Sequence, residues 1–249
     1  MDSDVHHEVT CDSLFSGRLT CRQPARGYRF SIDSVLLAHF IRPRSGDAVL
    51  DLGAGCGVIS LILAYRYSNI SLIALEIQSR LSQLIRHNVS SNAFENRIQV
   101  IEGDMQQINS LVEPGRFDWV VCNPPYRKVA SGRVNSTKEQ AVARHEIRAD
   151  LSQVVAAISY SLRTRGRLAV VYPARRAASL ITALKANGLE PKRLQMVHSY
   201  PGGEGRLVLV EALKGGGEEL NIQAPLYIYE EVDGDYTREM LEMFGNDEQ

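Results

Sequence analysis

The segment Asn123-Pro124-Pro125-Tyr126 follows the strand-like run Phe117–Cys122 and has the residue types to hold a planar substrate. Proline fixes φ and lacks a backbone donor, so two prolines end a strand and make a rigid turn. The Asn123 side chain and the Pro124 backbone each offer a carbonyl oxygen, and Tyr126 offers a flat ring. These groups suit a flat substrate that carries an NH2 donor. A plain strand end has the same composition, so the upstream sequence must decide between the two interpretations.

Glycines and carboxylates follow three earlier predicted strands. A glycine-rich loop, residues 51–57, allows a sharp turn and a close approach of the backbone to a ligand. It departs from the dinucleotide-binding pattern, because Val58 stands where the third glycine belongs. Glu76, 21 residues after Gly55, can accept hydrogen bonds from ribose hydroxyls, and Asp104 can accept one from an adenine amino group. Either acid alone would more often be a helix cap than a ligand, and the functional interpretation rests on their combination at successive strand ends.

Strands and helices alternate through most of the chain. Buried strands are predicted at 48–52, 70–75, 98–101, 117–122 and 168–172, with helices at 32–41, 58–67, 78–92, 151–162 and 174–187. Two further strands, 192–200 and 207–213, follow each other without a helix between them. This order predicts an α/β fold with a doubly wound, mostly parallel seven-stranded sheet and an antiparallel edge hairpin. The carboxyl ends of the parallel strands then meet at one crevice, which gathers the loop, both acids and the Asn-Pro turn.

The composition is that of an ordinary globular protein. The 249 residues are 44% hydrophobic and 23% charged. No apolar run approaches the roughly 20 residues that span a bilayer, and the N-terminus has no secretory signal pattern. The four cysteines form no C-x-x-C pair, so we expect reduced thiols, no metal site, no membrane and a cytoplasmic location.

The net charge of −1 hides an uneven distribution. Residues 1–210 hold 26 Lys and Arg against 18 Asp and Glu, whereas residues 211–249 hold 2 against 11. Either a polyanionic partner binds an electropositive body, or the arginines form a solvated surface beside an acidic tail. Residues 127–150 hold six Lys and Arg against three acids, which fits a substrate loop that contacts phosphates or a disordered surface loop.

Over residues 28–241 the chain resembles the class I S-adenosylmethionine-dependent methyltransferases with an N-P-P-Y motif. Within that group it is most similar to the tRNA adenine methyltransferases that modify the exocyclic amine of an adenine beside the anticodon of valine tRNA. The similarity to that subgroup rests on Gly27-Tyr28-Arg29-Phe30 before Asp33–Ala38, on Ala143-Arg144-His145-Glu146, and on Pro225–Tyr229 with Tyr236-Thr237. The resemblance implies a Rossmann-like class I methyltransferase fold, S-adenosylmethionine as cofactor and tRNA as partner.

The resemblance also implies a role for individual residues. Cofactor binding falls to Asp51, Gly53, Gly55, Gly57, Glu76, Ile77, Asp104, Met105 and Asn123, and catalysis to Asn123, Pro124, Pro125 and Tyr126. Substrate RNA would contact Phe30, Arg127, Lys128, Arg133 and Arg144, although Phe30 could equally be a core residue. We expect residues 1–45 to form an N-terminal extension and a helix on the core, 46–214 the methyltransferase core, and 215–249 an acidic segment packing on it.

Several other functions use similar residues. A protein glutamine methyltransferase, acting for example on a release factor, would offer its side-chain amide to the same turn, and a guanine amino-methyltransferase of ribosomal RNA is a third candidate. A non-catalytic RNA-binding module is the alternative outside the enzymes. A DNA adenine methyltransferase usually has a separate recognition domain, and Val58 disfavours a nicotinamide dehydrogenase. We expect a monomer or a weak dimer.

Overall fold

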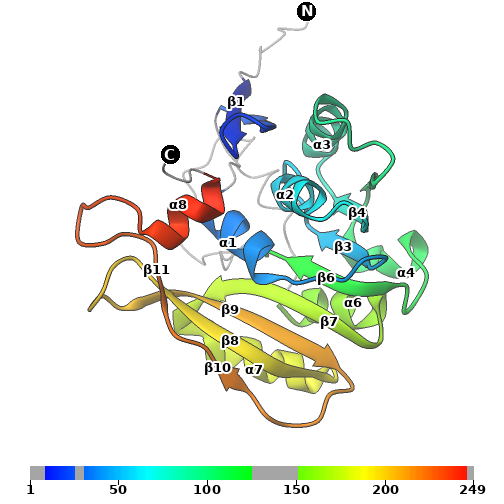
Figure 1. Ribbon diagram of the computed structural model, residues 1–249. Coiled ribbons are helices and arrows are strands. Elements are labelled where there is room, and N and C mark those ends of the chain that lie inside the picture. The colour runs from blue at the N-terminus through cyan, green and yellow to red at the C-terminus, as the bar shows by residue number, and fades with distance from the viewer. Residues whose placement is uncertain (1–8, 26–30, 125–150, 246–249) are drawn as a thin grey trace, which may run out of the picture.

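The centre of the molecule is a sheet whose strands come from the alternating part of the sequence (Figure 1). The computed structural model describes residues 9–25, 31–124 and 151–245. The seven main strands have the spatial order β8-β9-β7-β6-β3-β4-β5. Their bounds are β3 (Ala48–Leu52), β4 (Ser71–Glu76), β5 (Ile98–Glu102), β6 (Phe117–Cys122), β7 (Leu162–Pro173), β8 (Leu189–His198) and β9 (Gly205–Lys214). The predicted doubly wound α/β fold is confirmed.

The strand directions also agree with the prediction. β5, β4, β3, β6 and β7 run parallel to one another, and β9 runs antiparallel to both β7 and β8. The parallel strands read as continuous apolar runs because helices cover both of their faces. Two short strands, β10 (Asn221–Ile222) and β11 (Leu226–Tyr227), pair with β8 and widen this edge beyond the seven predicted strands.

Helices cover the two faces of the sheet and enclose two apolar cores. One face carries α1 (Ile32–Phe40), α2 (Val58–Arg66) and α3 (Ser79–Ser91); the other carries α4 (Ile108–Leu111), α6 (Leu151–Ser161) and α7 (Ala177–Ala186). The single-turn 3-10 helices η1 (Met105–Gln107) and η2 (Ala174–Arg176) precede α4 and α7. Within the described ranges, no helix combines the length and the apolar character needed to cross a membrane.

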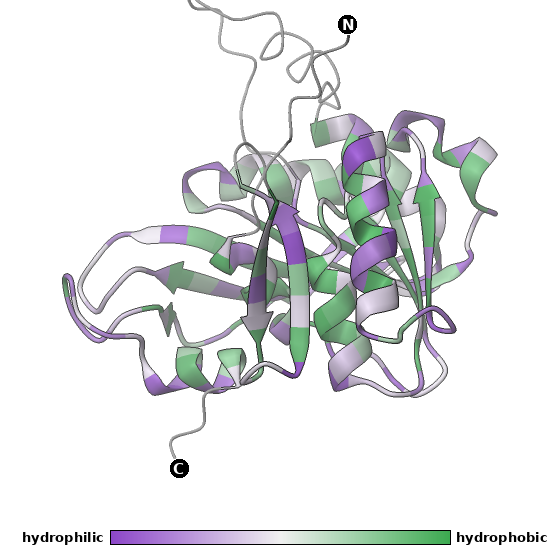
Figure 2. Cartoon of the chain, turned by 90° about the horizontal axis from the view of Figure 1, so that it is seen from above, coloured by the Kyte–Doolittle hydropathy of each residue, from purple (hydrophilic) through white to green (hydrophobic). Residues whose placement is uncertain are grey.

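The two helices nearest the glycine loop differ in their exposure. The first seven residues of α2 are buried, and a fully buried aliphatic side chain contributes about 1.5–3 kcal/mol. In α3 only one stripe is buried, including Leu81, Ile85 and Val89. Hydrophilic and hydrophobic positions therefore alternate along α3, whereas the sheet strands behind it are mostly hydrophobic (Figure 2). Both helices are fixed to the sheet from which the loop emerges.

The N-terminal extension forms an antiparallel hairpin of β1 (Val9–Leu14) and β2 (Leu19–Pro24). The side chain of Asn88 on α3 holds it in place: Oδ1 accepts a hydrogen bond from Arg22 N at 2.7 Å, and Nδ2 donates to the Arg22 carbonyl at 2.9 Å. The same Nδ2 also donates to the carbonyl of Cys56 in the glycine loop at 2.9 Å. The hairpin, α3 and the loop are therefore joined by one buried amide.

The acidic C-terminal segment folds back on the core and ends in α8 (Arg238–Phe244). Thr237 caps α8, since its Oγ1 accepts from Met240 N at 3.3 Å and donates to the Tyr227 carbonyl at 2.8 Å. Met240 is fully buried in the core that also holds α1 and α2. Phe15 N donates to the Phe244 carbonyl at 2.9 Å, so the two ends of the described chain meet.

Candidate active site

The ends of the parallel strands place the predicted site residues in one row. Leu52 pairs with Leu75, and Asp51 pairs with Val121. If these registers are extended past the strand ends, Gly53 lies level with Glu76 on one side and with Asn123 on the other. Neighbouring strands lie about 4.8 Å apart, so the backbones of Glu76 and Asn123 are separated by about 10 Å. That span suits a ligand with the dimensions of a nucleoside.

The glycine loop has a backbone that other residues rarely adopt. Gly53, Gly55 and Gly57 have φ values of 78°, 61° and 84°. At Gly57, a Cβ atom would lie 3.0 Å from the Ile85 side chain, so α3 packs directly on the loop. The backbone N–H of Gly53 donates to the Leu75 carbonyl at 2.9 Å. The loop is thereby fixed against the end of β4.

Glu76 fastens this loop through its carboxylate. Its Oε2 accepts a hydrogen bond from Gly55 N at 2.8 Å, and its Oε1 accepts one from Gln78 N at 3.0 Å. Burial raises the pKa of Glu76, while the hydrogen bonds from the backbone oppose that shift. Each carboxylate oxygen has a second lone pair, so Glu76 can hold the loop and also accept from a ligand.

Asp51 is completely buried beneath the loop. Its Oδ2 accepts from Ser60 Oγ at 2.7 Å and from Ser60 N at 3.2 Å, whereas its Oδ1 has no hydrogen-bond partner. Burial raises the pKa of Asp51 to about 7; the Ser60 hydrogen bonds lower it, and the charge of Glu76 raises it further. An unpartnered buried carboxylate oxygen is costly, so a ligand with a cationic donor would stabilise this site.

The predicted residues at the third strand end are placed as follows. Asp104 follows β5 and caps η1, since its Oδ1 accepts from Gln106 N at 2.9 Å. Met105 lies over the glycine loop, because a Cβ atom at Gly53 would stand 3.5 Å from Met105 Cε. Ile77 follows Glu76 and is half-buried. Asp104 therefore is a helix cap, which was the alternative to a ligand-binding role. It also lies on the same edge of the sheet as the other site residues.

Asn123 is oriented by a residue that the sequence analysis did not assign to the site. Asn123 Nδ2 donates a hydrogen bond to Ser34 Oγ at 3.1 Å. Ser34 lies on α1 and is buried. The two residues are 89 positions apart in the chain, and only the packing of α1 on the sheet brings them together. Ser34 belongs to the Asp33–Ala38 segment that supports the family resemblance. That membership is the feature of the sequence that could have pointed to a role for Ser34 in the site.

The structure describes only part of the predicted site. The described residues include Asp51, Gly53, Gly55, Gly57, Glu76, Ile77, Asp104, Met105, Asn123 and Pro124. The other predicted residues, Phe30, Pro125, Tyr126, Arg127, Lys128, Arg133 and Arg144, lie outside the described residues. The binding and catalytic roles of both groups stay predictions. Within the described part of the chain, no group of three His, Cys, Asp or Glu side chains is placed to hold a metal ion.

Comparisons with known proteins give a consistent result. Residues 29–179 match the family model described as the methyltransferase small domain. A tRNA1(Val) (adenine(37)-N6)-methyltransferase of Shewanella sp. (strain MR-4) is 29% identical over 226 residues, which are 90% of this chain and 92% of the relative. The enzyme of the same name from Porphyromonas gingivalis (strain ATCC 33277) is 30% identical over 200 residues, 78% of each chain.

A solved structure supports the fold independently. The crystal structure of a predicted O-methyltransferase from Agrobacterium tumefaciens has a TM-score of 0.71, with 22% identity over 86% of this chain and 96% of the other. At that identity the likeness concerns the fold alone. Since the family model covers more than half of the sequence, the chain belongs to the methyltransferase small domain family and is a methyltransferase.

Proposed function

We propose that the protein transfers a methyl group from S-adenosylmethionine to the exocyclic amino group of an adenine in tRNA. The observation that carries the proposal is the row formed by Glu76, Gly53 and Asn123, in which an uncharged amide lies level with a glycine loop and a carboxylate. The names of the relatives that match 90% and 78% of the chain support adenine in tRNA as the substrate.

The acidic half of the row fits the cofactor. Asp51 Oδ1 is a buried acceptor without a partner, which suits a cationic amine. Glu76 would accept from ribose hydroxyls, and Asp104, Ile77 and Met105, which follow the ends of β4 and β5, would contact the adenine ring. When bound, S-adenosylmethionine supplies an electrophilic methyl carbon on a sulfonium. The glycine loop keeps side chains away from the space between these groups.

The chain's own contribution to the reaction is electrostatic positioning. The amino lone pair of adenine is delocalised into the ring, so the nitrogen is a poor nucleophile. Hydrogen bonds from its two hydrogens to Asn123 Oδ1 and the Pro124 carbonyl would favour a pyramidal nitrogen and stabilise the positive charge that develops there. Stacking of the base on Tyr126 would add about 1–3 kcal/mol. No strong general base is needed, because the methylated nitrogen is acidic enough to lose its proton afterwards.

The substrate must present its base outside a helical stack, as for other enzymes that act on a nucleobase. Arg127, Lys128, Arg133 and Arg144 are proposed to contact the phosphates around that base, and Phe30 to line the pocket. The remaining parts of the proposal are a monomer or a weak dimer, no metal requirement and a cytoplasmic location, where tRNA is found.

One experiment separates this function from its rivals. The protein is incubated with methyl-labelled S-adenosylmethionine and, in separate reactions, with total tRNA, total ribosomal RNA and purified release factor. Label in tRNA that digests to N6-methyladenosine is the expected result. Label in the release factor would instead indicate glutamine methylation, and methylguanosine from ribosomal RNA the guanine reaction. No incorporation in any reaction would indicate a non-catalytic RNA-binding module.

A further inference from the structure

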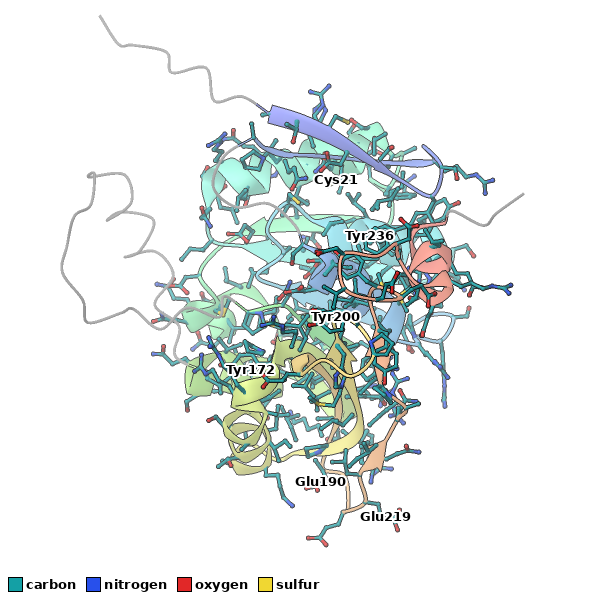
Figure 3. All side chains as sticks on the ribbon, turned by 90° about the vertical axis from the view of Figure 1, so that its left-hand side faces the viewer. Cys21, Tyr172, Glu190, Tyr200, Glu219 and Tyr236 are labelled. Atoms are coloured by element: carbon teal, nitrogen blue, oxygen red, sulfur yellow. The ribbon has the colours of Figure 1, made fainter. Side chains whose placement is uncertain are left out.

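The edge of the sheet that carries the active site has two halves of opposite charge. On the side of β3, β4 and β5 the strand ends carry the acids Asp51, Glu76 and Asp104. On the side of β7 and β9 they carry arginines: Arg175 and Arg176 in η2, directly after β7, and Arg206 near the start of β9. Figure 3 views this edge, with Tyr172 and Tyr200 marking its β7–β9 half.

The strand registers place these arginines beside the catalytic turn. Cys122 pairs with Val170, so Pro124 comes level with Tyr172, the next-to-last residue of β7. Pro173 pairs with Leu207 in the antiparallel register of β7 and β9, so Ala174 comes level with Arg206. A Cβ atom at Gly205 would lie 3.7 Å from Ala174 Cβ, which confirms the contact between η2 and the β8–β9 turn. Arg175 and Arg176 thus lie one strand away from Asn123, and Arg206 lies two strands away. All three are on the side opposite the acids.

The arginine side chains have the character of a binding surface. Arg175 and Arg206 are exposed, and neither forms an ion pair with another described residue. Arg176 is half-buried, with its Cζ 5.2 Å from the centroid of the Tyr172 ring. Glu204 is the one acid in the turn between β8 and β9. Among the described residues of η2, the β8–β9 turn and the start of β9, three arginines stand against one acid, so this rim has a net positive charge.

We propose that Arg175, Arg176 and Arg206 bind the phosphate backbone of the RNA substrate, so that the RNA leaves the pocket over β7 and β9. This inference rests on the proposed function. A nucleotide whose base reaches Asn123 carries phosphates on both sides, and the acidic half of the edge repels them. Guanidinium groups bind phosphate oxygens in a bidentate manner, so this half of the edge attracts them. The charge distribution therefore fixes the direction of the RNA across the site.

The test compares two variants that each lose three arginines. The first is Arg175→Ala/Arg176→Ala/Arg206→Ala; the control is Arg42→Ala/Arg44→Ala/Arg165→Ala, whose residues are exposed near the amino ends of β3 and β7. Both lose the same charge, so a general effect of net charge would be equal. The Kd for tRNA is measured by fluorescence anisotropy from 50 to 200 mM salt, and cofactor binding by calorimetry.

For the first variant, we expect the Kd for tRNA to rise about tenfold at low salt and the slope of log Kd against log salt to fall by about 2 to 3. Cofactor affinity should not change, and the control should match the wild type in tRNA binding. Equal effects in both variants, or none in the first, would overturn the inference. If Arg176→Ala impairs folding, the double variant Arg175→Ala/Arg206→Ala retains the test. A wild-type protein that methylates no tRNA would refute the proposed function itself, which is a distinct result.

Discussion

Replacing Ser34 with alanine should slow methyl transfer without weakening cofactor binding. Asn123 Nδ2 donates to Ser34 Oγ at 3.1 Å, and this bond keeps the nitrogen end of the amide turned toward α1. The opposite end, Oδ1, is the acceptor that the substrate amine needs. Without the serine, the amide loses this orienting bond, and its flipped form would present a donor to another donor.

The magnitude follows from the burial of Ser34. Ser34 is only 1% exposed, so water does not readily replace its hydroxyl. A buried polar group that loses its partner costs about 1–3 kcal/mol. If that cost appears in the transition state, kcat falls by about 5- to 150-fold, since 1.36 kcal/mol corresponds to a factor of ten.

The assay compares Ser34→Ala with Ser60→Ala. Both serines are buried, and both bond to a site residue from a neighbouring helix, but Ser60 donates to Asp51 in the cofactor half. We expect Ser34→Ala to lower kcat with saturating tRNA and leave the cofactor Kd unchanged, and Ser60→Ala to raise the cofactor Kd. A kcat of Ser34→Ala within twofold of the wild type, in a protein that unfolds at the wild-type temperature, would refute the reasoning.

Three further predictions concern the row of site residues. Asn123→Ala should abolish methyl transfer while calorimetry still detects cofactor binding; near-normal turnover would remove Asn123 from the mechanism. Glu76→Ala frees the N–H groups of Gly55 and Gln78, so calorimetry should show cofactor affinity reduced about tenfold or more. Burial raises the pKa of Asp51 from its ordinary 3.8 to about 7, so the folded protein retains a proton that the unfolded chain releases. Asp51 should therefore make the cofactor-free protein lose stability as the pH rises from about 4 to 7. Denaturant titrations should show that the unfolding free energy of Asp51→Asn, minus that of the wild type, increases over this pH range. A difference that stays constant with pH would contradict this prediction.

The fold could be predicted where local sequence alone decides the structure. β3 and β6 have the predicted bounds, because each is an apolar run ended by glycine or proline. β7 begins six residues before its predicted start, and the added part includes polar residues such as Arg163 and Arg165 that carry no strand signal. For the residues of the β1–β2 hairpin, the sequence predicts only an N-terminal extension. The hairpin is held by the side chain of Asn88, whose contacts with Arg22 depend on the tertiary fold.

The same division applies to the site. Glu76, Asp104 and the glycines could be predicted because the position of a residue at a strand end is a local property, and the sheet gathers these ends. Their internal bonds could not be predicted: the sequence shows neither that Asp51 has an oxygen without a partner nor that Ser34 contacts Asn123. Both facts depend on how α1 and α2 pack against the strands.

An uncharged residue at the junction of the two halves of the edge suits both ligands of this reaction. The acids at Asp51 and Glu76 attract a cationic cofactor, and the arginines of η2 and β9 attract a polyanion. A carboxylate at position 123 would also accept from the substrate amine, but it would attract the sulfonium and repel the RNA phosphates. An arginine or lysine there would oppose the positive charge that develops on the nitrogen. The Asn123 amide accepts the hydrogen bond and carries no net charge, so both ligands can approach the same point.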